Sequence, residues 1–252
     1  MYVMAIANQK GGVGKTTTAV NLSACLAEQG KKILMLDIDP QGNATSGLGL
    51  EKKNIKFCIY DALINDVPLE KTIKSTYFEN LDLVPSTIQL AGAEIELVST
   101  LSREVRLKKI ISKMPNNYDY TIIDCPPSLG LLTINALTAA DGVFVPIQCE
   151  YYALEGLGQL VNTINLVRQH LNNDLKIKGV LLTMYDSRTN LSSQVAEEVK
   201  AYFKGLVYTS IIPRNIRLSE APSYGKPIID YDPRSKGADV YRSLAREVIE
   251  KG

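Results

Sequence analysis

Residues 3–17 of the chain read VMAIANQKGGVGKTT, and this stretch decides the fold. An apolar run of strand length, Val3–Ala7, is followed by a glycine-rich loop and then by a segment of helical period, Thr16–Glu28. Glycines let backbone N–H groups approach phosphate oxygens closely, and the positive end of the following helix lies at the same place. A loop of this composition between a strand and a helix predicts a phosphate-binding site.

The polar residues of the loop suit a nucleotide. Lys15 is placed to reach the β- and γ-phosphates, and the hydroxyl of Thr16 is placed to ligate Mg²⁺. The loop departs from the common G-x-x-x-x-G-K-T pattern, because Gln9 stands where the first glycine is expected and a second lysine, Lys10, follows it. The sequence therefore predicts a variant phosphate loop.

Strand-like and helix-like segments alternate along the whole chain. The expected strands are Val3–Ala7, Ile33–Leu36, Leu81–Val84, Tyr120–Ile123, Val143–Ile147, Val180–Met184 and Val207–Ile212. The expected helices are Thr16–Glu28, Leu131–Ala139, Gly156–Leu171, Leu191–Phe203 and Ala238–Glu250. This order predicts an α/β fold of the P-loop nucleotide-hydrolase kind, with a mainly parallel, twisted sheet covered by helices on both faces. We expect one domain spanning residues 1–252, with its least regular stretch at Gly42–Phe57.

Composition excludes several classes of protein. Lys and Arg number 28 against 27 Asp and Glu, so the net charge of +1 does not by itself point to a nucleic-acid or membrane partner, and any basic surface must be local. Four scattered cysteines without a CxxC pair argue against a disulfide framework or a zinc ribbon. No apolar run approaches the ~18 residues of a membrane-spanning helix. We expect a soluble protein of the cytoplasm.

Acidic residues follow two of the expected strands. Residues 34–43, LMLDIDPQGN, place Asp37 and Asp39 two positions apart, on one side of an extended chain. Residues 120–127, YTIIDCPP, form an apolar strand that ends in Asp124. An Asp after a strand is commonly a turn residue. Because ligand-binding groups of open α/β sheets gather at the carboxyl ends of strands, the two acidic motifs together indicate carboxylates near the phosphate loop.

These three elements resemble the deviant Walker A, Walker A′ and Walker B motifs of the ParA/MinD family of ATPases. The matching segments are Lys10–Thr16, Asp37–Asn43 and Asp124–Pro127. Residues 213–222, PRNIRLSEAP, and 225–228, GKPI, resemble the C-terminal region of the chromosomal ParA branch, often called Soj. The resemblance extends from about residue 3 to residue 246.

The resemblance implies ATP and Mg²⁺ as cofactors and assigns roles to residues. Lys10 would reach across a nucleotide-sandwich dimer to the partner's ATP, and Asp39 would position or polarise the attacking water. Asp124 would support the metal through water. The implied catalytic residues are Lys10, Lys15 and Asp39, and the implied metal residues are Thr16, Asp39 and Asp124. The implied nucleotide-binding residues are Gly11, Gly12, Val13, Gly14, Lys15, Thr16, Thr17, Pro213 and Arg214.

Three basic residues are candidates for a DNA-binding surface. Residues 201–252 hold nine basic and six acidic residues, a local excess of three positive charges. Arg188 and Arg217 match positions that resemble the DNA-binding arginines of the family, and Lys226 would join them if loops after successive strands converge. The alternative is that all three are solvated surface charges. The C-terminal helix has a small apolar face, Val240, Leu244 and Val248, which suits core packing better than a membrane.

The resemblance implies an ATPase that partitions chromosomes or plasmids. Its ATP-bound homodimer would bind double-stranded DNA without sequence preference at the nucleoid, and not a membrane. Slow Mg²⁺-dependent hydrolysis, stimulated by a ParB-like partner, would separate the dimer and release it. The alternative is a related ATPase that positions another cargo, such as a protein array, or acts at a membrane. The sequence does not separate these, because the partner protein selects the cargo.

Overall fold

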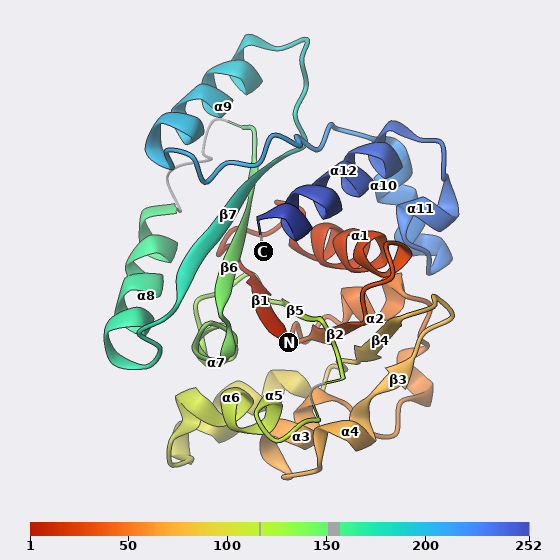
Figure 1. Cartoon of the computed structure of the whole chain (residues 1–252). Coiled ribbons are helices and arrows are strands. Elements are labelled where there is room, and N and C mark those ends of the chain that lie inside the picture. The colour runs from red at the N-terminus through yellow and green to blue at the C-terminus, as the bar shows by residue number, and fades with distance from the viewer. Residues whose placement is uncertain (116, 151–156, 252) are drawn as a thin grey trace.

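The computed structural model describes residues 1–115, 117–150 and 157–251. Its centre is a seven-stranded sheet with the order β3-β4-β2-β5-β1-β6-β7 (Figure 1). The strands are β1 Tyr2–Ile6, β2 Ile33–Asp37, β3 Lys74–Ser75, β4 Leu81–Val84, β5 Tyr120–Asp124, β6 Gly142–Gln148 and β7 Lys176–Thr183. The short edge strand β3 pairs with β4 in antiparallel fashion, and the remaining pairings in this sheet are parallel. The predicted fold class is confirmed.

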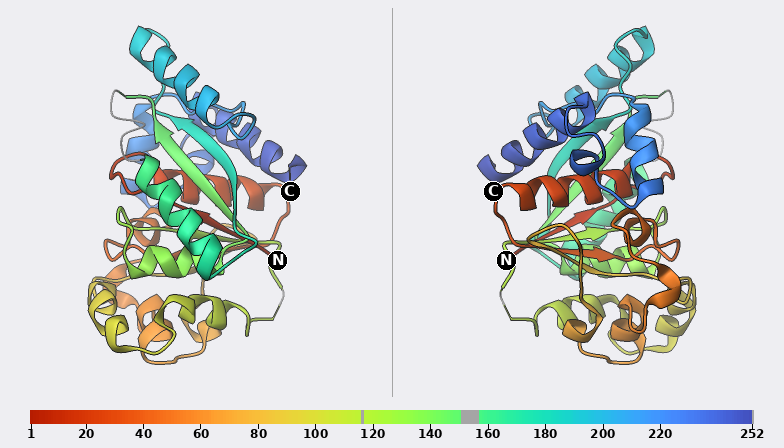
Figure 2. Two further views of the ribbon diagram at one scale, coloured as in Figure 1. Left: turned by 90° about the vertical axis from the view of Figure 1, so that its left-hand side faces the viewer. Right: turned by 90° about the vertical axis from the view of Figure 1, so that its right-hand side faces the viewer.

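Helices cover both faces of the sheet, and Figure 2 shows these layers from two sides. The longer helices are α1 Lys15–Glu28, α7 Leu131–Ala139, α8 Leu157–His170, α9 Asn190–Tyr202 and α12 Lys236–Glu250. The shorter ones are α2 Asn43–Gly47, α3 Ile59–Ile64, α4 Leu69–Thr72, α5 Leu90–Glu96, α6 Arg106–Ile111, α10 Ile216–Glu220 and α11 Ile228–Tyr231. Single 3₁₀ turns lie at Lys52–Asn54, Leu97–Ser99, Arg103–Val105 and Ala221–Tyr224.

Alternate residues of the central parallel strands serve two separate hydrophobic cores. On β2, Ile33 and Met35 pack in the core that contains α1 and α12, whereas Leu34 and Leu36 pack in the core of α3 and α5 to α9. All four side chains are fully buried, which contributes roughly 1.5–3 kcal/mol each. A strand buried on both faces reads as a continuous apolar run, and this is why the parallel sheet was predictable.

The C-terminal helix packs as predicted. Leu244 and Val248 of α12 are buried against α1, and Val240 lies at the edge of the same core. The four cysteines are buried and free. In the described part of the chain, no helix is both long enough and apolar enough to cross a membrane. The helix predicted from Gly156 is described from Leu157, because Gly156 lies outside the described residues.

One predicted strand, Val207–Ile212, is wrong. The segment runs beside β7 and forms an isolated bridge between Val207 and Val180, with a further hydrogen bond from Ile212 N to Leu182 O at 2.9 Å, but no continuous strand. Its central amides are taken by a helix instead, because Thr209 N and Ser210 N donate to the carboxylate of Glu247 at 2.9 and 2.8 Å. In a parallel ladder alternate N–H groups face the neighbouring strand, and Tyr208 N and Ile212 N do bond to carbonyls of β7. Between them Ser210 N is taken by Glu247 of α12, which interrupts the ladder.

Candidate nucleotide site

The glycine-rich loop leaves β1 and is fixed at its first residues by Asn8. The Asn8 side chain donates to the carbonyl of Pro146 at 2.8 Å and accepts from Lys10 N at 3.0 Å. Farther along, Gly12 and Gly14 have φ values of 75° and 89°, a region that favours glycine. Thr18 N donates to Gly14 O at 2.9 Å in the first turn of α1. The glycines therefore supply the backbone shape that brings the loop to the start of the helix.

Lys15 is held over the loop in a nearly buried position. Its Nζ donates to the carbonyl of Lys10 at 2.9 Å, and the residue is 7% exposed. Burial lowers the pKa of Lys15, while the carboxylates of Asp124 and Asp39 act in the opposite direction. A single backbone carbonyl cannot satisfy three ammonium donors. The arrangement therefore leaves Lys15 ready to donate to an anion in the loop.

The carboxylates come from the ends of β2 and β5, beside the loop. Asp37 accepts from Thr45 N, Thr45 Oγ1 and Asp39 N, at 2.8, 2.7 and 3.2 Å. Asp39 is 7% exposed and accepts from Gln41 N at 2.9 Å. The side chain of Asp37 therefore stabilises the segment that follows β2, residues 38–45. Asp39, in the same segment, lines a cavity.

Asp124 is fully buried, and no well-formed hydrogen bond reaches either of its carboxylate oxygens from the described residues, although the Thr16 hydroxyl and Lys15 lie near enough to favour its charged form. Burial, followed by the nearby Asp37, raises the pKa of Asp124 well above its usual range. No group of three or more His, Cys, Asp or Glu in the described residues is placed to hold a metal. Mg²⁺ commonly takes one or two carboxylates and keeps its waters and the phosphates of the substrate as the other ligands. The unpartnered carboxylate beside the phosphate loop fits that cation.

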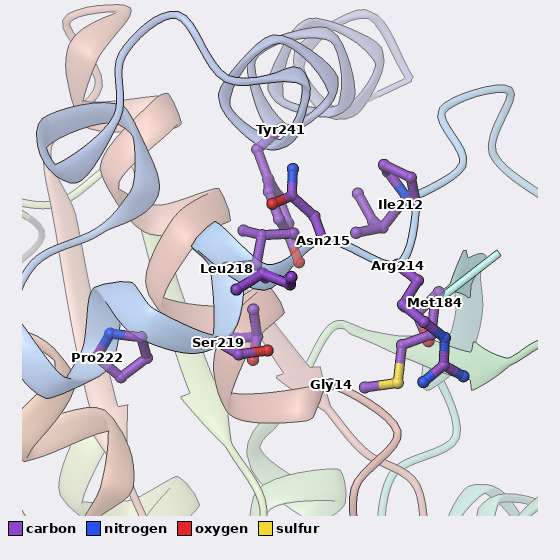
Figure 3. A pocket seen from close by; sticks show the side chains of 13 residues that line it. Gly14, Met184, Ile212, Arg214, Asn215, Leu218, Ser219, Pro222 and Tyr241 are labelled. Carbon is purple, nitrogen blue, oxygen red and sulfur yellow. The ribbon is translucent and has the colours of Figure 1, made fainter. Parts of the chain in front are cut away.

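Two cavities meet at the phosphate loop. The first, about 290 Å³, is lined by Gly11, Gly12, Gly14, Lys15, Thr16, Thr17, Asp39, Gln41, Asn43, Pro127 and Met184. The second, about 430 Å³, adds an apolar wall that includes Ile212, Pro213, Ile216 and Leu218, together with Arg214 and Asn215 (Figure 3). Thr17 lines both cavities. We name the first the polar cavity, for Lys15 and Asp39 in its wall, and the second the apolar cavity, for its wall of Ile212, Pro213, Ile216 and Leu218, although polar side chains such as Arg214 and Asn215 also line the second. The two adjoin through shared lining residues, as a molecule with a phosphate tail and a base would require.

The structure thus gathers most of the predicted nucleotide residues around these cavities. Lys10, Val13 and Asp124 are not among the lining residues. Val13 and Asp124 are buried, and the described contacts of Lys10 run through its backbone. Sequence reasoning missed Met184, Asn43 and Asn215 as lining residues. The Asx pattern before α10 could have found Asn215, because its side chain accepts from Arg217 N at 2.8 Å and caps that helix.

The three basic candidates for DNA binding each lie beside an acid. Arg188 contacts Asp186 at 2.7 Å, and Lys226 contacts Asp230 at 2.9 Å. Lys226 also lines a third cavity, about 380 Å³, with Thr16 and Thr17.

The third candidate, Arg217, contacts Glu220 at 2.9 Å and Asp232 at 3.6 Å. The side chain of Arg188 is 85% exposed and that of Arg217 is 56% exposed. Both arginines therefore remain accessible to a macromolecular anion, and their role in DNA binding stays a prediction.

Comparison with known proteins agrees with this geometry. Residues 1–177 match a family described as "AAA domain". The sporulation initiation inhibitor protein Soj of Bacillus subtilis (strain 168) is 68% identical over 250 residues, which cover 99% of this chain and 99% of that protein. The chromosome partitioning protein ParA of Myxococcus xanthus (strain DK1622) is 57% identical over 99% of this chain and 88% of its own length.

A solved structure shows the same fold with a nucleotide bound. The cobyrinic acid a,c-diamide synthase of Mycobacterium smegmatis, with ADP and magnesium, superposes with a TM-score of 0.87 at 41% identity. The alignment covers 99% of this chain and 94% of that one. From its motifs, its fold and these relatives, the chain belongs to the ParA/MinD family of ATPases with a deviant Walker A loop.

Proposed function

We propose that this protein is a partitioning ATPase whose ATP-bound dimer holds DNA and releases it on hydrolysis. The observation that carries the proposal is the joining of two cavities at the phosphate loop, one polar and one apolar, beside an unpartnered buried carboxylate. The chain binds ATP and Mg²⁺, as solved relatives of the same fold bind ADP or an ATP analogue with magnesium. The triphosphate would occupy the polar cavity, and the base would lie against the apolar wall that includes Pro213.

Each residue at the loop has a defined task in hydrolysis. Lys15 donates to the phosphates, Thr17 contacts the α-phosphate, and the loop amides that begin at Gly11 surround them. Thr16 would hold Mg²⁺ together with Asp124, which acts through coordinated water, and Asp39 contributes to the same site. The bound cation neutralises charge on the phosphates. Asp39 also positions the attacking water, because it is the carboxylate that faces the cavity.

Dimerisation would complete the site. Lys10 lies at the start of the loop and outside the described cavity walls, so its ammonium is available to a second subunit. A lysine supplied by the partner would place positive charge at the γ-phosphate only in the ATP dimer, which links assembly to nucleotide state. Hydrolysis would be slow until a ParB-like partner stimulates it.

DNA is the proposed acceptor of the dimer, with the nucleoid as its location. Soj and ParA, similar in sequence over nearly the whole chain, support a partitioning role. Arg188 and Arg217 are exposed enough to reach a phosphate backbone, and Lys226 would add to them. Leu244 and Val248 are buried in the core and unavailable to a membrane, which favours DNA over the membrane alternative. A protein array as cargo would use the same nucleotide chemistry.

The decisive experiment measures binding to a non-specific DNA duplex with no nucleotide, with ADP, with ATP and with a non-hydrolysable analogue, across a salt series. Binding only with ATP or the analogue, weakening steeply as salt rises, would support the proposal. Arg188→Glu should lose DNA and keep dimerisation. Arg168→Glu on α8, an exposed arginine outside the proposed surface, is the matched control. Intact ATP binding and dimerisation without DNA binding would point instead to a membrane or a protein array.

The role of Asp39 has its own test. Asp39→Ala should keep ATP binding and DNA binding and abolish turnover, because it removes the carboxylate that positions water while Lys15 and Thr16 still hold the nucleotide and Mg²⁺. Undiminished hydrolysis by this variant would contradict that assignment.

A further inference from the structure

Met184 follows β7 directly and has a backbone conformation that its side chain disfavours. Its φ is 51°, in the left-handed region. The other described residues with positive φ, glycines aside, are Asp66, Asn80 and Ser102. Short polar side chains form local hydrogen bonds and visit this region more readily, whereas methionine has no such compensation. Residues held in sparsely populated conformations gather at functional sites, so this one calls for an explanation.

The position of Met184 suggests one. Gly14, Thr17 and Met184 line both the polar and the apolar cavity. Gly14 and Thr17 belong to the phosphate loop and α1, so among the described lining residues Met184 is the one that reaches the joint from elsewhere. Figure 3 shows its side chain directed toward the phosphate loop at Gly14.

The surrounding backbone fixes Met184 in this conformation. On one side, Thr183 Oγ1 donates to Val13 O in the phosphate loop at 2.9 Å. On the other side, Tyr185 N donates to Ile212 O at 3.0 Å, and Arg214 N donates to Tyr185 O at 3.0 Å. Residue 184 therefore bridges the phosphate loop and the wall of the apolar cavity, and both neighbours hold the turn in place.

We propose that Met184 is a positioning residue that packs against the sugar of the bound nucleotide at the joint of the two cavities. The inference rests on the proposed binding of ATP. A nucleotide that places phosphates in one cavity and its base in the other must pass its sugar through this joint. The thioether side chain is flexible and uncharged, so it packs on the carbon atoms of the sugar without competing for the phosphates.

The test compares Met184→Gly with Met184→Leu in equilibrium binding of ATP and of ADP. Glycine accepts the positive φ but leaves the joint unfilled, whereas leucine conserves volume and apolar character. Met184→Gly should weaken ATP and ADP equally, by about tenfold, because both carry the sugar at the joint. Met184→Leu should bind both nucleotides within about twofold of the parent protein.

Several outcomes would overturn the assignment. If Met184→Gly binds ATP and ADP as tightly as the parent protein, Met184 makes no contact that matters for binding. If it loses affinity for ATP but not for ADP, the contact is with the γ-phosphate and not with the sugar. Equal losses of nucleotide affinity in Met184→Gly and Met184→Leu would show that apolar volume at the joint does not determine binding. Melting of the nucleotide-free variants separates binding from folding, since a large fall in Tm confined to Met184→Gly would assign the side chain to the fold. If the parent protein binds no ATP, the proposed function itself fails, which is a distinct result.

Discussion

Asp37 at the end of β2 and Asp124 at the end of β5 stand directly opposite each other in the parallel register, and both are fully buried. Their surroundings differ. Asp37 accepts three hydrogen bonds, whereas no well-formed hydrogen bond reaches either oxygen of Asp124 from the described residues. Burial raises the pKa of Asp37 to about 6, against the effect of its hydrogen bonds. The two carboxylates therefore differ in role: Asp37 is bound by the segment that follows β2, whereas Asp124 is the one that we propose to act on a bound Mg²⁺.

Replacing Asp124 by Asn should separate folding from metal use. The substitution removes a buried carboxyl group that lacks well-formed hydrogen bonds. The free energy of unfolding of the nucleotide-free protein should therefore rise by about 1–3 kcal/mol, and its Tm should rise with it. The same change should abolish Mg²⁺-dependent hydrolysis. Melting in EDTA and in Mg²⁺ with ATP measures the stability effect, and phosphate release measures the turnover.

The matched control is Asp37→Asn, where an amide group would face the N–H and O–H donors that now surround a carboxylate. This variant should lose stability in EDTA. A lower Tm for Asp124→Asn in EDTA would contradict the division of roles between the two acids.

Thr45 connects the Asp39 loop to the neighbouring strand, and this connection should matter for both stability and turnover. Its hydroxyl donates to Asp37 at 2.7 Å and accepts from Ser86 N at 2.9 Å. Thr45→Val keeps the shape but leaves Ser86 N buried and unpaired, which costs about 1–3 kcal/mol. We expect a lower urea midpoint of unfolding and a lower kcat for ATP hydrolysis, with nearly unchanged ATP affinity. The reason is that the segment carrying Asp39, residues 38–45, is held less firmly.

Thr45→Ser is the control for that experiment, since it retains the hydroxyl. It should lie close to the parent protein in kcat. If Thr45→Val unfolds at the parent's urea concentration, the hydrogen bonds of this threonine contribute nothing measurable.

Several elements were predictable because their signals are local. The phosphate loop needs glycines at fixed positions, and the buried strands need continuous apolar runs. Residues 59–111 carry four short helices, α3 to α6, that the sequence did not reveal. Helices of four to seven residues show too few turns for an apolar stripe, so tertiary packing decides them.

The errors at the site have a different cause. Val207–Ile212 has the composition of a strand, but Glu247, more than thirty positions later, takes two of its amides. Met184 lines two cavities through a positive φ that nothing in its residue type indicates. Both features depend on contacts between segments far apart in the sequence, which single-sequence patterns do not contain.

Substitution by alanine should destabilise the protein far more at Gly225 than at Gly30, although both glycines have a positive φ. Its φ is 65°, and a Cβ there would lie 2.7 Å from the Cα of Gly49. Gly30 has a φ of 79°, and nothing lies within 4 Å of its Cβ position. Gly30→Ala should therefore cost only the left-handed backbone strain, about 1–2 kcal/mol.

Gly225→Ala adds a clash of the new Cβ with the backbone of Gly49, which cannot move away as a flexible side chain could. It should therefore lower Tm much more than Gly30→Ala does. Thermal melts of the two variants side by side test this prediction. Equal Tm values would show that the approach of residues 49 and 225 relaxes without cost.

Arg217 should bind DNA more strongly once its acidic neighbours are neutralised, if the proposed DNA surface is correct. In the free chain Arg217 contacts Glu220 at 2.9 Å and Asp232 at 3.6 Å. Replacing these acids with Gln and Asn should free the guanidinium for a phosphate. Each further phosphate that the protein neutralises steepens the slope of log K against log salt by about 0.9. The measurement is the salt dependence of non-specific duplex binding in the ATP state.

Glu197→Gln, which frees Lys200 from a similar pair on α9, is the control. A general increase in positive charge would raise affinity in both variants, and more in the first, which loses two acids against one. An unmasked arginine that contacts a phosphate should steepen the slope only in the first. Parallel slopes would show that these ion pairs do not restrain Arg217.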